Sequence, residues 1–197
     1  FSMYSTYPRI AKVLKGVTSS SLFEARLGYE EMGKEVHIFA PAYIEEEFDE
    51  ILRYCDHIVF NSFDQWNKYR GRVEAVTSKK VECGIRVNPE YSEIETSIYD
   101  PCYRYSRLGV TLDNFRPDEL EGIDGLHFHT MCEQNSYTLE RTAKVIDQKF
   151  GRYIEGMKWL NMGGGHHITR SDYDLEVLIN TILFFKCKYH HRHFILH

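Results

Sequence analysis

Short apolar segments alternate with longer segments of helical periodicity along this chain, and this alternation constrains its fold most strongly. The apolar segments are short enough to be buried strands, and they lie near residues 17–20, 36–40, 57–60, 81–87, 124–129, 158–162 and 193–196. A strict strand–helix order predicts parallel strands joined by helical crossovers. An eight-stranded (β/α) barrel without its opening strand has this order, and so does a doubly wound open sheet. Periodicity alone does not separate these two α/β folds.

The helical segments carry their own start and stop signals. Ser21 with Glu24, and Ser62 with Gln65, have the spacing of capping boxes, and Gly33 and Gly151 are expected to end helices. A further helix is expected over residues 7–16. Apolar stripes predict the buried faces of three helices: Ile44, Phe48, Ile51 and Leu52; Leu139, Ala143, Ile146 and Phe150; and Leu175, Leu178, Ile179 and Ile182. Residues 88–118 have no sustained period, and a loop of that length is often functional.

Composition bounds the class of protein. A chain of 197 residues that is 43% hydrophobic is expected to form one globular domain over residues 1–197. The net charge is −5 without a basic stripe, which argues against nucleic acid, and no apolar run approaches the ~20 residues of a membrane span. Five cysteines without a C-x-x-C pair favour reduced thiols and a cytoplasmic location. The opening residue Phe1 is not expected to be the natural start.

The run "NMGGGHH" follows one predicted strand and precedes a helix. The amides of Gly163, Gly164 and Gly165, together with a helix N-terminus, are typical of an anion site and favour phosphate binding. A turn that relieves crowding at a strand end is the other interpretation.

Two histidines of "LHFHT" share one face of a strand, because side chains two residues apart point to the same side. His127 is interpreted as a core histidine, whereas His129, nearer the strand end, is the better functional candidate. His129 could stack flat on an aromatic ligand, and the pair could instead ligate zinc.

Charged side chains lie near two predicted strand ends. Glu133 could hold a cationic group or could complement the dipole of the following helix. Arg86, inside an apolar strand, needs a partner or an anionic ligand. Two function classes remain open on the residues alone: a phosphate-anchored cofactor enzyme that uses the glycine loop and His129, and a metal-dependent hydrolase that uses His127, His129 and His166 or His167. The histidine-rich end, "YHHRHFILH", lacks the carboxylate or cysteine spacing of a metal site.

Longer stretches carry a family resemblance. The segments "GIRVNPEYSEIETSIYDPCYRYSRLGVTLDNF", "GLHFHTMCEQN" and "MKWLNMGGGHHITRSDYDLEVLI" resemble the carboxynorspermidine decarboxylases, which are pyridoxal-phosphate (PLP) decarboxylases of the alanine-racemase fold. The resemblance extends from Phe1 to about Tyr189. It implies a PLP-binding (β/α)8 barrel followed by a β-rich C-terminal domain, and a homodimer. It also implies decarboxylation of carboxynorspermidine or carboxyspermidine to norspermidine or spermidine.

The resemblance further implies roles for individual residues. His129 matches the histidine that stacks on the pyridine ring, and Gly163 to Gly165 match the loop that holds the cofactor phosphate. Ser21, with Glu24, matches a rim element of the second strand, and Arg86 joins the expected cofactor-binding set. Glu133 falls in the loop expected to face the substrate, and no residue is expected to bind a metal.

Two departures from the family pattern accompany the matches. The Schiff-base lysine of the family lies at the end of the first strand, which is expected upstream of Phe1. The Glu-Pro-Gly-Glu segment expected near the last strand is replaced by "HFILH", ending at His197. The resemblance therefore implies an incomplete barrel, an internal fragment of a decarboxylase that is expected to be inactive alone.

Overall fold

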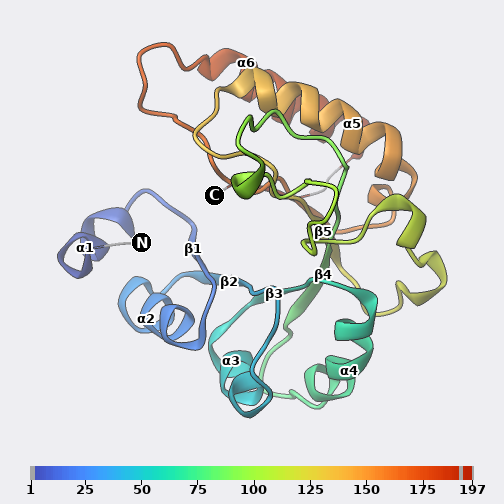
Figure 1. Ribbon diagram of the computed structural model, residues 1–197. Coiled ribbons are helices and arrows are strands. Elements are labelled where there is room, and N and C mark those ends of the chain that lie inside the picture. Colours follow the sequence, from blue (N-terminus) through green and yellow to red (C-terminus); the bar gives the residue numbers. More distant parts are fainter. Residues whose placement is uncertain (1–2, 191–192, 197) are drawn as a thin grey trace. The chain divides into compact units, whose positions relative to one another are not determined.

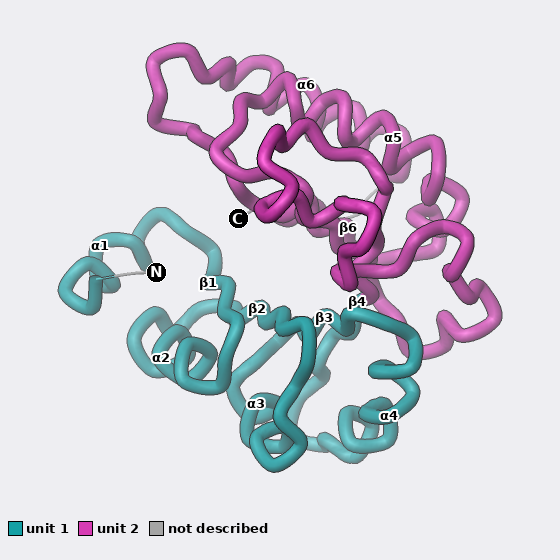
Figure 2. Tube along the Cα trace, viewed as in Figure 1, with its two compact units in different colours: residues 1–84 teal, residues 85–197 magenta. Residues whose placement is uncertain are grey.

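A computed structural model describes residues 3–190 and 193–196, so Phe1, His191 and His197 lie outside the described residues. The chain divides into two compact units, residues 1–84 and 85–197, shown in teal and magenta in Figure 2. Strand β4 (Glu82–Arg86) contains the boundary between the units.

The first unit carries four strands and four α-helices, which alternate along the chain (Figure 1). Its elements are η1 (Tyr4–Thr6), α1 (Tyr7–Ile10), β1 (Gly16–Ser19), α2 (Leu22–Met32), β2 (Glu35–Phe39), η2 (Glu45–Glu47), α3 (Phe48–Tyr54), β3 (His57–Phe60), α4 (Phe63–Glu74) and the first part of β4. Strand β2 pairs in parallel with both β1 and β3.

The second unit continues the same alternation after a long loop. Its elements are η3 (Ser97–Tyr99), η4 (Leu112–Asn114), η5 (Pro117–Glu119), β5 (Gly125–His127), α5 (Ser136–Ile154), β6 (Trp159–Asn161), α6 (Leu175–Lys188) and β7 (His193–Ile195). Strand β6 pairs in parallel with β5 and β7, and the strand order follows the chain from β1 to β7. All seven predicted strands are therefore confirmed, and consecutive strands are neighbours.

The predicted helix caps form as hydrogen bonds. Ser21 Oγ accepts from the N–H of Glu24 at 3.3 Å, and Ser62 Oγ accepts from the N–H of Gln65 at 3.1 Å. Each long side chain reaches back one residue further than in the standard box, so Glu24 accepts from the N–H of Ser20. Gly33 ends α2 in the left-handed conformation with φ 57°, as expected.

Aromatic side chains fill the core of the first unit. Phe48, Phe60 and Trp66 are each at most 2% exposed, and Phe48 stacks on Tyr69 with ring centroids 4.0 Å apart. Each such burial contributes roughly 1.5–3 kcal/mol relative to an exposed side chain. In the second unit the predicted stripe Leu139, Ala143, Ile146 and Phe150 is fully buried along α5.

Three sequence predictions about helices are wrong. The helix expected over residues 7–16 covers only Tyr7–Ile10, and Val13 and Leu14 that would have extended it are exposed. Ile44 lies before α3 and is 57% exposed. Gly151 does not end α5, which continues to Ile154; a Cβ at Gly151 would lie 2.6 Å from the Tyr189 hydroxyl, so the glycine makes room for that ring.

The inward face of α6 also differs from the prediction. The buried residues are Leu178, Thr181 and Phe185, whereas Leu175 and Ile179 are about half exposed. The helix is apolar on most sides, so hydrophobic spacing alone did not define one face.

Gly125 and Gly71 offer a matched test of this packing. A Cβ at Gly125 in β5 would lie 2.0 Å from the Trp159 ring, whereas a Cβ at Gly71 in α4 meets nothing within 4 Å. Gly125→Ala is expected to lower stability by about 1–3 kcal/mol through overpacking, and Gly71→Ala to raise it by about 1 kcal/mol through helix propensity. Thermal unfolding followed by circular dichroism measures both changes, and equal effects of the two variants would contradict the packing around Trp159.

Candidate functional site

The candidate site residues of the second unit gather where three neighbouring strands end. Arg86 is the last residue of β4, His129 lies two residues beyond β5, and Gly163 lies two residues beyond β6. Main-chain bonds keep these ends in register: Val87 N–H donates to His127 O at 2.7 Å, and Phe128 N–H donates to Asn161 O at 2.9 Å. The carboxyl ends of parallel strands are where ligands bind in α/β folds.

Arg86 holds the backbone of His129. Its guanidinium donates to His129 O at 2.9 Å, and the side chain is 6% exposed. Burial lowers the pKa of Arg86 to about 10, so the group stays charged at neutral pH. The structure therefore supplies the partner that an arginine in an apolar strand needs, and this partner is a carbonyl of the same site.

His129 is a neutral imidazole at pH 7. Burial first, and then the charges of Arg86 and His166, lower its pKa to about 4. The residue as a whole is half-buried. His127, by contrast, is 1% exposed inside β5, as a core histidine should be, and its ring centroid lies 6.2 Å from that of His129.

Two of the three glycines pack closely against the segment that follows β5. Gly163 has φ 73°, and a Cβ there would lie 2.5 Å from Phe128 O and 2.8 Å from His129 Cα. Gly165 has φ 88°, and its Cβ would lie 2.2 Å from Met131 O. Both the left-handed backbone and the close approach exclude side chains here, so relief of crowding is a real role of this turn.

Two backbone N–H groups of the turn have no acceptor within the described chain. Gly163 N–H donates to Asn161 Oδ1 at 2.9 Å. Within residues 3–190 and 193–196, the N–H groups of Gly164 and Gly165 donate no hydrogen bond, and Gly164 is buried. Buried amides are almost always paired, so the amide of the buried Gly164 favours an acceptor from outside the chain.

Glu133 lies at the edge of this group and is exposed. It has a left-handed φ of 53°, and its carboxylate lies 3.9 Å from His167 Nε2. Helix α5 begins at Ser136 with Asn135 as its cap, so Glu133 is outside the first helical turn. Its expected place in a substrate-facing loop remains a prediction.

Ser21 belongs to the first unit, where its hydroxyl caps α2. Its expected contribution to cofactor binding remains a prediction, as do those of Arg86, His129 and the glycines.

The metal-hydrolase alternative gains no support. Among the described residues, the His, Cys, Asp and Glu side chains close enough together to hold a metal are Glu35, His37 and His57. His127, His129, His166 and His167 do not form such a group among the described residues.

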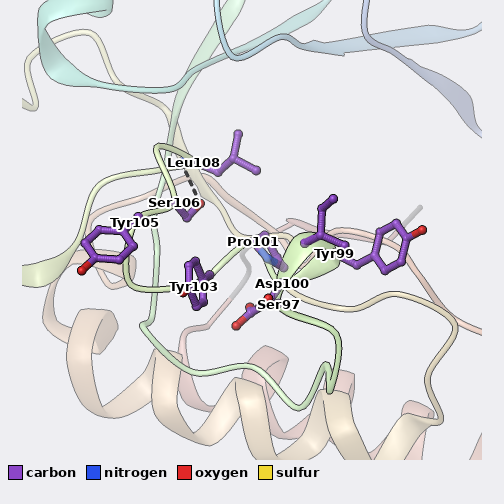
Figure 3. Close-up of a pocket in the computed structure, with 9 residues that line it drawn as sticks. Ser97, Tyr99, Asp100, Pro101, Tyr103, Tyr105, Ser106 and Leu108 are labelled. Carbon is purple, nitrogen blue, oxygen red and sulfur yellow. Dashed lines mark hydrogen bonds between the residues drawn. The ribbon is translucent and has the colours of Figure 1, made fainter.

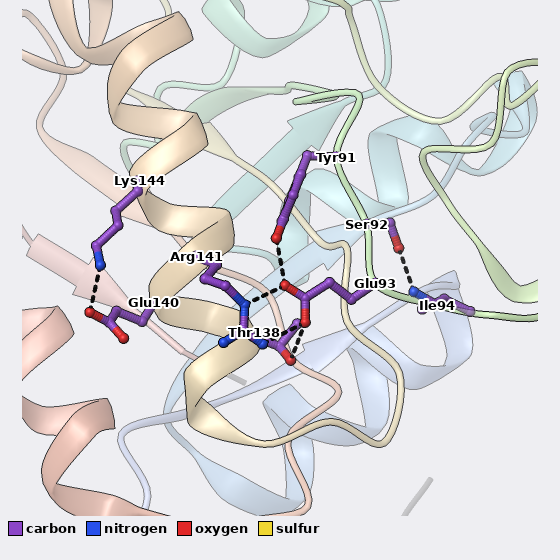
Figure 4. A network of polar contacts seen from close by, with 8 residues as sticks. All are labelled: Tyr91, Ser92, Glu93, Ile94, Thr138, Glu140, Arg141 and Lys144. Atoms are coloured by element: carbon purple, nitrogen blue, oxygen red, sulfur yellow. Dashed lines mark hydrogen bonds and ion pairs between the residues drawn. The ribbon is translucent and has the colours of Figure 1, made fainter.

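The long loop of residues 88–118 is fastened beside this site by a network that sequence reasoning missed (Figure 4). Arg141 of α5 makes a bidentate ion pair with Glu93, with N–O distances of 2.6 and 2.7 Å. Thr138 and Tyr91 also donate to the Glu93 carboxylate. The Arg141 guanidinium first, and then these two donors, lower the pKa of Glu93 to about 2. Ser92 Oγ donates to Thr130 O at 3.4 Å, next to His129. No spacing rule pairs residues 45–48 positions apart, so only the fold reveals the network.

Two hollows lie away from the glycine turn. One, of about 280 Å³, is formed within the loop and is shown in Figure 3; its lining residues are Ser97, Ile98, Tyr99, Asp100, Pro101, Tyr103, Tyr105, Ser106 and Leu108. The other, of about 390 Å³, lies between α5 and α6 and includes Asp147, Thr181 and Phe184. Neither contains a predicted site residue.

No protein-family profile matches the chain, whereas individual proteins do. The chain is 44% identical over 180 residues to the carboxynorspermidine/carboxyspermidine decarboxylase of Campylobacter jejuni. This alignment covers 91% of the chain and 46% of that protein. The chain is also 40% identical over 193 residues to the carboxyaminopropylagmatine decarboxylase of Synechocystis, in an alignment that covers 98% of the chain and 48% of that protein. The chain thus spans about half the length of the curated relatives it matches.

Solved structures agree with these relatives. The crystal structure of carboxynorspermidine decarboxylase from Campylobacter jejuni, complexed with norspermidine, matches 98% of the chain and 48% of its own with a TM-score of 0.87 at 40% identity. Diaminopimelate decarboxylase from Helicobacter pylori matches 98% of the chain and 53% of its own with a TM-score of 0.73 at 15% identity, a likeness of fold alone.

These matches define the class by its fold, the α/β barrel of the alanine-racemase fold, which is incomplete in this chain. Within that class, the chain is a homologue of the carboxynorspermidine/carboxyspermidine decarboxylases. Both the predicted family resemblance and the predicted fold are confirmed.

The Glu93 network yields a test by proteolysis. Glu93→Gln is expected to speed tryptic cleavage at the exposed Arg104 and Arg107 about three- to tenfold, because weaker anchoring raises the population of the open loop. Glu140→Gln is the matched control, since Glu140 lies on α5, as Arg141 does, and pairs with Lys144 at the surface. Equal cleavage rates in the two variants would mean that Glu93 does not hold the loop.

The depressed pKa of His129 predicts acid sensitivity. Its folded-state pKa of about 4 lies below the ordinary value of 6.5, so protonation favours the unfolded chain. The contribution of a neutral His129 to stability is complete above pH 6.5 and is lost as the pH falls from 6.5 towards 4. Thermal unfolding at pH 7 and pH 5 should therefore show a smaller pH difference for His129→Gln than for wild type. The control variant is His193→Gln, at an exposed residue. If His129→Gln shows the same pH difference as wild type, His129 is not the group that titrates.

Proposed function

We propose that this chain supplies the cofactor-binding barrel of a PLP-dependent decarboxylase that acts on carboxynorspermidine or carboxyspermidine and forms norspermidine or spermidine. The observation that carries the proposal is the 44% identity over 91% of the chain to an enzyme of that name. The proposal includes residues 1–197 as one partial barrel domain, a β-rich C-terminal domain in the complete enzyme, a homodimer and a cytoplasmic location.

The glycine turn fits the phosphate of PLP. The amides of Gly164 and Gly165 donate no hydrogen bond within the described chain, and they lie in a turn in which Gly163 and Gly165 have left-handed backbones. Successive amides in such a turn form a concave anion site that does not depend on a charged side chain. Gly163 and Gly165 keep this turn pressed against the segment after β5, so the donors have a fixed position.

His129 fits a role against the pyridine ring. Its imidazole is neutral at pH 7, so it can lie flat on an aromatic ring without adding a charge to the site. Arg86 fixes the backbone of this residue through its carbonyl, which limits the positions of the ring. When bound, PLP supplies the electron sink for loss of CO2, and the protein contributes binding and orientation.

Glu133 is suited to the cationic substrate. Its carboxylate is 76% exposed beside the site, where it can attract the ammonium groups of a polyamine. Because exposed charges are screened by salt, we expect Glu133 to raise the association rate of the substrate more than its affinity.

A second carboxylated polyamine is the alternative substrate for the same site. The relative from Synechocystis that is 40% identical over 98% of the chain is named for carboxyaminopropylagmatine. That name favours the same decarboxylation on a guanidinium-bearing substrate.

The test is an assay of the full-length gene product with PLP and each of the three carboxylated substrates. We expect CO2 release and formation of norspermidine or spermidine, with a higher kcat/KM than for carboxyaminopropylagmatine. Preference for carboxyaminopropylagmatine would reassign the substrate, and no turnover of any of them would refute the proposed function.

Variants of the glycine turn test the phosphate site. Gly164→Val is expected to weaken PLP affinity by at least about tenfold, because the side chain blocks close approach to the amides. Equilibrium dialysis measures the affinity, and circular dichroism checks the fold. Gly71→Ala, in α4 of the first unit, should leave the affinity unchanged. Unchanged affinity in Gly164→Val would leave the turn with its packing role alone.

A further inference from the structure

We propose that Glu35, His37 and His57 form a binding site for a divalent transition metal ion, zinc in the first place. The three side chains come from the first unit, where Glu35 and His57 are the first residues of β2 and β3. One ligand atom from each residue lies within 4.8 Å of the other two. The proposal does not depend on the proposed decarboxylase function.

Strand pairing brings these side chains together. His37 and His57 are direct partners in the parallel register of β2 and β3, so they share one face of the sheet. Glu35 lies two residues before His37 and therefore points to that same face. Its carboxylate oxygen lies 3.4 Å from His37 Nε2. The pairing of β2 with β3 thus brings Glu35, His37 and His57 together on one face of the sheet.

The donor set suits zinc. Two imidazole nitrogens and one carboxylate are a known three-ligand combination for Zn²⁺, which leaves a fourth position for water or another ligand. Both rings are available as neutral ligands, because burial lowers the pKa values of His37 and His57, the latter to about 4. The charges of Asp56 and Glu82 act on the His57 ring and add negative potential around the cluster.

Metal binding requires a small movement. The two rings are stacked with centroids 4.1 Å apart and an interplanar angle of 6°. Imidazole lone pairs lie in the ring plane, so the rings must tilt towards each other to share an ion. His37 is the fixed member: it is 9% exposed, and its carbonyl accepts from Ser19 Oγ at 3.1 Å. His57 is only half-buried and the Glu35 side chain is 57% exposed, so these two ligands can adjust.

The experiment titrates the EDTA-stripped chain with Zn²⁺ against a competing chelator, and with Co²⁺ as a spectroscopic probe. We expect one Zn²⁺ per chain and a visible Co²⁺ spectrum typical of four-coordinate geometry. His57→Gln should weaken Zn²⁺ binding by at least about tenfold, because loss of a ligand exceeds the 10–100-fold effect of outer-shell changes. Mg²⁺, which prefers oxygen ligands, should not compete.

His190→Gln is the matched control, because His190 belongs to the histidine-rich end and could bind zinc independently of the cluster. It should retain wild-type affinity. Loss of binding in His190→Gln but not in His57→Gln, or no stoichiometric binding by the wild type, would overturn the proposal.

Thermal unfolding gives a second measurement if His57→Gln fails to fold. Zn²⁺ bound to the folded chain should raise its melting temperature. Glu35→Gln changes an exposed side chain, so it should fold and show a smaller rise than wild type. An equal rise in Glu35→Gln and wild type would remove Glu35 from the site and overturn the three-ligand assignment.

Discussion

Main-chain pairing that continues past the strand ends is the interaction on which the candidate site depends. Beyond β5 and β6, Gln134 N–H donates to Gly165 O at 3.0 Å, and His167 N–H donates to Gln134 O at 3.1 Å. The loops after these strands therefore stay in register, as the strands themselves do. This contact requires glycines at 163 and 165, since any Cβ would collide with the neighbouring backbone. The amides of Gly164 and Gly165 belong to the loop after β6. The same contact pairs that loop with the loop after β5, which contains His129.

The charged side chains around that contact bond to protein groups. Arg86 is buried and charged, and its guanidinium donates to the carbonyl of His129. Its charge also lowers the pKa of the His129 imidazole, which helps to keep that ring neutral. The carboxylate of Glu93 is committed to Arg141, which fastens the long loop to α5. The proposed phosphate site thus rests on backbone amides, whereas the charged side chains around it hold loops and backbone in place. No helix among the described residues is long and apolar enough to cross a membrane.

The histidines of the chain divide by environment. His127 is enclosed in β5, His129 is half-buried at the strand end, and His37 and His57 stack near the starts of β2 and β3. Spacing in the sequence drew attention to His127 and His129, because they lie two residues apart. It missed His37 and His57, which are twenty positions apart and meet only through strand pairing. The five cysteines, all within the described residues, form no disulfide, and Cys55 and Cys83 are buried.

The sequence by itself determined the alternation of strands and helices, the caps at Ser21 and Ser62, and the glycine turn, because each depends on residues within one short segment. It also carried the family resemblance, since the motifs around His129 and Gly163 are contiguous. Only the tertiary structure decided that Arg86 bonds to His129, that Gly151 lies inside a helix to admit Tyr189, and that α6 buries Phe185 rather than Leu175. Those outcomes depend on which distant segments become neighbours, and side-chain periodicity within one segment holds no information about its neighbours in space.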